Sequence, residues 1–134
     1  MPPNTTPVFT LTPHISSART ATANTNRDGT GTLATVATGQ ANGTRIDRVT
    51  IEGTGASTTP GMVRFYLDDG AGNIRLIKEI PVTAATPSAT VLGFFYEWVR
   101  TDTYPVEVLP NGWMLKAAPH NAEQFDIVAH GGDF

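Results

Sequence analysis

The sequence has 134 residues, a length typical of one domain with a single hydrophobic core. It carries 9 basic and 12 acidic residues, for a formal net charge of -3, and its only lysines are Lys78 and Lys116. This charge argues against nucleic-acid binding through a broad basic surface. The absence of cysteine excludes disulfides, cysteine-ligated zinc and thiol catalysis.

The composition favours short β-strands over helices. Charged residues make up only 16% of the sequence, and threonine, alanine and glycine replace the missing charge. Threonine favours strands and glycine supplies the dihedral angles of tight turns. The polar, proline-rich residues 1–12 lack the pattern of a signal peptide, and no apolar run is long enough to span a bilayer. We therefore expect a protein made in the cytoplasm, with no membrane partner.

Residues 1–30 are expected to form an extended N-terminal arm, and residues 31–134 the β-domain. Prolines interrupt the arm at Pro2, Pro3, Pro7 and Pro13. A Thr/Ala/Asn stretch then leads into a turn at residues 26–29. Arms of this kind either lie across a neighbouring subunit or fray in solution, and the sequence leaves both open.

Short alternating segments predict an antiparallel, jelly-roll-like β-sandwich of about eight short strands, with an open barrel as the alternative. The clearest signal is a hairpin in which residues 62–67 and 73–82 flank an Asp-Asp-Gly turn. The other predicted strands are residues 32–36, 45–52, 90–99, 113–117 and 124–129. The pair Asn42-Gly43 is typical of a hairpin turn.

The run Thr-Val-Leu-Gly-Phe-Phe-Tyr-Glu-Trp-Val at residues 90–99 is apolar on both faces of a strand. Such a strand is either central and covered on both sides, or it has one face against another subunit. Aromatic residues are enriched at the centres of protein interfaces. The candidate interface residues are Phe94, Phe95, Tyr96, Trp98, Trp113, Pro7 and Phe9.

The residues that could bind a metal have simpler interpretations. His14, His120 and His130 lack metal-binding spacing, so we expect them at strand ends or in loops. Asp68 and Asp69 lie among glycines, but the alternating ligands and closing glutamate of a calcium loop are absent. A hairpin turn explains these aspartates better.

No motif for catalysis is visible. The segment Gly55-Ala56-Ser57 begins like a nucleophile elbow but lacks the second glycine, and no Walker-type phosphate loop occurs. Glu97 beside Trp98 leaves an aromatic-lined sugar site as a minority hypothesis. We expect no enzymatic activity, no cofactor and no metal.

Three segments carry a resemblance to a class of proteins. They are Ala-Asn-Thr-Asn-Arg-Asp-Gly-Thr-Gly at residues 23–31, Gly-Met-Val-Arg-Phe-Tyr-Leu-Asp-Asp-Gly at 61–70, and the C-terminal residues 120–134. Together they resemble small all-β structural proteins of tailed-phage virions. The resemblance implies a decoration (cement) protein on the capsid surface, which commonly forms homotrimers and binds the major capsid protein. A tail or head-fibre component is the first alternative, and a carbohydrate-binding module is the second.

Overall fold

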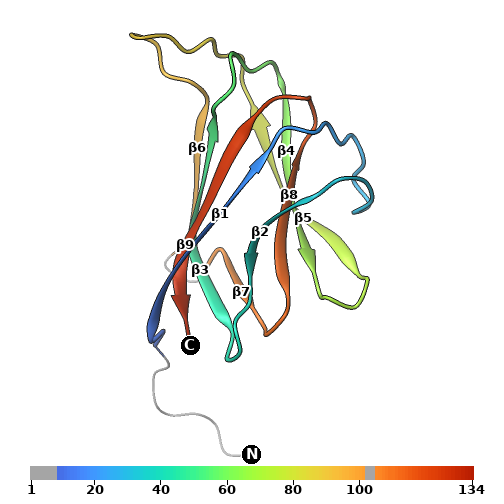
Figure 1. Cartoon of the computed structure of the whole chain (residues 1–134), viewed down its shortest axis with the longest axis vertical. Helices are drawn as coiled ribbons and strands as arrows, with labels where there is room; N and C mark the ends of the chain where they lie inside the picture. The colour runs from blue at the N-terminus through green and yellow to red at the C-terminus, as the bar shows by residue number, and fades with distance from the viewer. Residues whose placement is uncertain (1–8, 102–104) are drawn as a thin grey trace, which may run out of the picture.

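The structure, a computed structural model, describes residues 9–101 and 105–134. These residues contain β-strands and no helix, and the strands form two antiparallel sheets packed against each other (Figure 1). The predicted all-β antiparallel sandwich is therefore confirmed. The strands are β1 (Thr12–Thr20), β2 (Ala34–Thr38), β3 (Thr44–Gly53), β4 (Gly61–Asp68), β5 (Ile74–Val82), β6 (Phe95–Val99), β7 (Glu107–Leu109), β8 (Met114–Pro119) and β9 (Phe125–Asp133).

The strand pairs are nested along the chain. Sheet A has the order β1-β9-β3-β6, with β7 also paired to β3, and sheet B has the order β2-β8-β4-β5. Thus β1 pairs with β9, β2 with β8, β3 with both β6 and β7, and β4 with β5. The first and last described strands, β1 and β9, therefore lie side by side in sheet A.

The core lies between the sheets and follows the predicted alternation. Val63 and Phe65 of β4 are fully buried, as are Ile127 and Ala129 of β9. The hairpin of β4 and β5 forms as predicted, with Gly61 opposite Val82 at its open end. Burying each large apolar side chain contributes about 1.5–3 kcal/mol, so this alternation fixes which face of each strand turns inward.

Part of the predicted N-terminal arm belongs to the sandwich. Strand β1 pairs with β9 along its whole length, from Thr12 opposite Asp133 to Thr20 opposite Phe125. This segment lacks the alternating large apolar residues that usually reveal a strand. It can form a strand without them because it is held largely by backbone pairing along β9. Pro7 and the rest of residues 1–8 lie outside the described residues.

The turn at Asn42-Gly43 forms, but it does not close a hairpin. Gly43 has a φ of 94°, and its N–H donates to the carbonyl of Gln40 over 2.9 Å. The flanking strands β2 and β3 belong to different sheets, so the turn joins the two layers. The Asn-Gly sequence explains why the chain reverses here. Burial of β2 and β3 in one core explains why the two strands pair in different sheets.

Residues 90–99 are not one central strand. Only Phe95–Val99 forms β6, and among the described residues β6 pairs only with β3, at the edge of sheet A. The preceding residues approach β3 differently, since the carbonyl of Phe94 accepts the N–H of Gly53 over 2.8 Å. The short strand β7, which the sequence did not predict, continues the same edge further along β3.

Candidate functional site

Large apolar side chains are exposed along residues 91–99, which lead into and form β6. Leu92 is 90% exposed, Phe95 55% and Val91 51%. Val99 and Tyr96 are also exposed. Single exposed apolar residues are ordinary, but several in one segment mark an interaction surface. Tyr96 lies opposite the buried Ile51, on the other face of β6 from Phe95 and Val99. We call Val91, Leu92, Phe95 and Val99 the β6 patch.

Pairing with β3 explains which side chains of β6 face outward. Phe95 lies opposite Glu52 and Val99 opposite Arg48, and both of those partners are exposed. Trp98 lies opposite Val49, which is fully buried. The alternation of a strand therefore divides the aromatic run between the outer face of sheet A and the core.

The predicted interface residues separate into two groups. Phe95, Tyr96 and Phe9 are exposed, and Phe9 reaches 71%. The other three described residues pack on or in the core. Phe94 is buried edge-on against Phe125 at 6.1 Å, Trp98 lies 5.2 Å from the ring of Phe65, and Trp113 is partly buried.

Sequence reasoning missed exposed residues on the other edge of sheet A. Leu11 and Ile15 are 83% and 72% exposed, and Ile15 lies on β1. Each lies between polar residues, so the sequence contains no apolar run at this place that would have predicted an exposed surface. The pairing of Ile15 with His130 places it on the outer face of sheet A.

The outer face of sheet A carries ion pairs between its apolar residues. Arg19 and Asp126 approach to 2.7 Å on β1 and β9, and Arg48 and Glu97 to 3.5 Å on β3 and β6. The hydrogen bond from Arg19 holds the pKa of Asp126 below its usual value. A shallow pocket of about 390 Å³ beside this first pair is also lined by Ser17, Ala18 and Val128.

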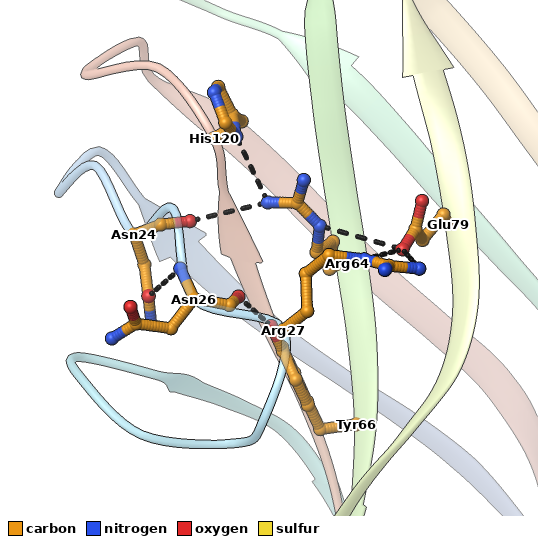
Figure 2. Close-up of polar contacts among 7 residues, drawn as sticks. All are labelled: Asn24, Asn26, Arg27, Arg64, Tyr66, Glu79 and His120. Carbon is orange, nitrogen blue, oxygen red and sulfur yellow. Dashed lines mark hydrogen bonds and ion pairs between the residues drawn. The ribbon is translucent and has the colours of Figure 1, made fainter.

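Part of the outer face of sheet B is covered by the chain itself. Residues 21–33, which we call the strap, cross this face between β1 and β2 (Figure 2). The Tyr66 hydroxyl of β4 donates to the carbonyl of Asn26 over 2.8 Å, and Tyr66 is fully buried. This burial raises the pKa of the Tyr66 phenol. Arg27 reaches Glu79 of β5 at 2.6 Å.

Arg64 is the buried centre of the contacts beneath the strap. Its side chain is 7% exposed and lies 3.7 Å from Glu79. Its Nη1 donates to His120 Nδ1 over 3.1 Å and to the Asn24 carbonyl over 3.5 Å (Figure 2). A guanidinium can only donate, so His120 accepts this hydrogen bond at Nδ1. The strap thus shields an ion pair that would otherwise be exposed on the sheet.

A second polar cluster lies where β1 begins and β9 ends. His14 Nδ1 is 3.0 Å from Asp133 Oδ1, and His14 Nε2 is 3.0 Å from Ser16 Oγ. Thr44 Oγ1 also donates to Asp133 Oδ1, over 2.6 Å. Sequence reasoning placed His14 at a strand end and missed this cluster, because pairing of β1 with β9 brings the aspartate to it.

The aspartates at the β4–β5 turn hold backbone N–H groups, as the turn interpretation predicted. Asp68 accepts from Gly70 and Asp69 from Ala71, each over 2.8 Å. A hydrogen bond from Lys116 lowers the pKa of Asp68. Within residues 9–101 and 105–134, no three His, Cys, Asp or Glu side chains gather as metal ligands, and no helix could cross a membrane.

Comparisons with protein-family models, with curated proteins and with solved structures found no match to this chain. Function is therefore inferred from the fold and the surfaces of the chain itself.

Proposed function

We propose that this chain is a structural virion protein that decorates and stabilises the capsid of a tailed phage or phage-like particle. The observation that carries the proposal is the β6 patch, where Phe95 and Val99 are exposed at the edge of sheet A and Leu92 is exposed in the loop before β6. A surface of this kind is expected to be covered in an assembly. The resemblance to virion structural proteins supplies the kind of assembly.

The nested strand pairs support a jelly-roll sandwich. When β6 and β7 are counted as one interrupted strand on β3, eight strands pair first with last, inward along the chain. Jelly rolls occur in viral capsid and lectin domains. The fold is therefore compatible with a virion role, while the exposed surfaces must decide between the functions that share it.

We further propose a homotrimer that contacts the major capsid protein. The β6 patch would supply the apolar centre of the contact between copies, and the ion pairs of sheet A its polar rim. Many identical contacts on a shell add through multivalency, so each one can be weak. Phe9 and Leu11 are exposed apolar side chains near the N-terminal end of β1, and a neighbouring subunit would contact them.

A tail or head-fibre component would use the same surfaces and remains the first alternative. A carbohydrate-binding module is favoured less, because Trp98 lies against Phe65 and below Lys78, whose Nζ is 5.9 Å from the ring centroid. A sugar-binding platform needs an open aromatic face. Loss of a glycan-array signal in Trp98→Ala or Trp113→Ala would favour the sugar-binding alternative.

The test is binding of the purified chain to expanded capsids of its own particle. We expect saturable binding with a fixed number of copies per capsid. The double variant Phe95→Ser/Val99→Ser should weaken binding by tenfold or more, an order of magnitude typical for apolar interface residues. Ile77→Ser, which changes a side chain 37% exposed on sheet B, is the matched control and should bind normally. Absence of binding by the unmodified chain would refute the proposal.

A further inference from the structure

Ser16, His14 and Asp133 lie in one continuous run of close polar contacts. The distances are 3.0 Å from Ser16 Oγ to His14 Nε2 and 3.0 Å from His14 Nδ1 to Asp133 Oδ1. Ser16 and His14 are two residues apart on β1 and therefore share one face of the strand. Their half-buried positions contrast with the exposed Ser17, which lies on the opposite face.

The partners of His14 determine where its proton lies. An ionised carboxylate only accepts hydrogen bonds, so a neutral His14 places its proton on Nδ1, the nitrogen 3.0 Å from Asp133 Oδ1. In the neutral ring Nε2 is then the acceptor, and the hydrogen bond at this nitrogen comes from the Ser16 hydroxyl. A serine proton directed at an imidazole base that a carboxylate orients is the arrangement that activates a serine nucleophile.

The surroundings hold this arrangement in place. The Thr44 hydroxyl of β3 donates to the same Asp133 oxygen over 2.6 Å, which orients the carboxylate. The side chains of His14 and Asp133 are only 10% and 20% exposed. A partly dry, fixed base costs less reorganisation during proton transfer than a mobile surface histidine.

We propose that Ser16 is an activated nucleophile and a site of covalent acylation by activated esters. Ser16 Oγ attacks the carbonyl carbon of the ester while its proton passes to His14 Nε2. The new Oγ–C bond forms, the bond from carbon to the leaving oxygen breaks, and the leaving group takes the proton from His14. The product is Ser16 carrying the acyl group, and no oxidant or cofactor takes part. This property is independent of capsid binding.

The test treats the full-length chain with p-nitrophenyl acetate and maps acetyl groups by peptide mass spectrometry. We expect Ser16 to be acetylated in preference to the other serines. Ser16→Ala should abolish the modification, and His14→Gln should slow it by about 100-fold or more, the contribution usual for a positioned base. Ser17→Ala, which removes a hydroxyl from the neighbouring exposed position, is the matched control and should leave the rate unchanged.

Two further variants separate activation from folding. Asp133→Asn should slow acetylation of Ser16, because the amide no longer orients the imidazole as a proton acceptor. Thermal melts of each variant check that the fold is kept. Acetylation of Ser16 at the same rate as Ser17 in the unmodified chain would overturn the proposal, as would an unchanged rate in a folded His14→Gln variant.

Discussion

The strap can be tested by removing a single oxygen atom. Tyr66→Phe deletes the hydroxyl that donates to the Asn26 carbonyl over 2.8 Å and leaves the buried ring in place. The ring continues to pack on the outer face of sheet B, so the change isolates one hydrogen bond between β4 and the strap. We expect the strap to open more often while the sandwich stays folded.

The magnitude follows from the environment of the two partners. A net hydrogen bond is worth about 0.5–1.5 kcal/mol, and more if a buried partner is left unpaired. Asn26 is exposed, so water can reach its carbonyl once the hydroxyl is gone. We therefore expect a loss of about 1 kcal/mol in the free energy of unfolding. For a chain of this size, that corresponds to a fall of about 3–5 °C in Tm.

The assay combines urea unfolding with hydrogen exchange of the amides in residues 21–33. Exchange in the strap should accelerate by about fivefold, the factor equivalent to 1 kcal/mol, and amides of β4 and β8 that exchange only by global unfolding should accelerate by no more than this factor. Tyr96→Phe removes the same atom from an exposed ring on β6 and should leave both measurements unchanged. If the strap amides exchange at the same rate in Tyr66→Phe as in the unmodified chain, the view that this hydrogen bond holds the strap against sheet B is refuted.

Three other predictions concern the core, the turn and the strap. Phe65→Ala should lower the free energy of unfolding by about 3–5 kcal/mol in urea titrations, because Phe65 is fully buried between the sheets. The fold lowers the pKa of Asp68, so the ionised carboxylate stabilises the fold fully above the unfolded pKa near 3.9. This contribution to the free energy of unfolding is lost as pH falls through the lower folded pKa. In pH-dependent melts, Asp68→Asn should therefore lose less Tm on acidification than the unmodified chain. Gly31→Ala should cost more in Tm than Gly72→Ala. Both glycines have a positive φ, at 87° and 92°, but only at Gly31 would a Cβ meet the Asn24 side chain, at 2.7 Å.

Strict alternation and turn chemistry made part of the fold predictable. In residues 62–67, Val63 and Phe65 point inward while Arg64 and Tyr66 point outward, and an Asp-Gly turn follows. Local sequence therefore specified both the strand and its hairpin partner. The outward side chains of this strand are nevertheless buried, because the strap covers them, and no local pattern could reveal a distant covering segment.

Elements held by distant partners escaped prediction. Strand β1 reads as polar, and its pairing with β9 joins Ser16 to Ala129 across most of the chain. The serine, histidine and aspartate cluster depends on the same pairing, with His14 the only one of the three that drew attention in the sequence. Phe94 and Phe95 are adjacent and equally apolar, yet one is buried and the other exposed, since only the position of β6 along β3 decides between them.

The oligomeric mass of the full chain, measured in solution by analytical ultracentrifugation and on its particle by cryo-electron microscopy, tests the central proposal most directly. We predict a homotrimer, in solution or on the shell, with Phe95 and Val99 buried between copies or against the capsid. A chain that is monomeric in both settings, with the β6 patch exposed to solvent on the particle, would contradict the proposal.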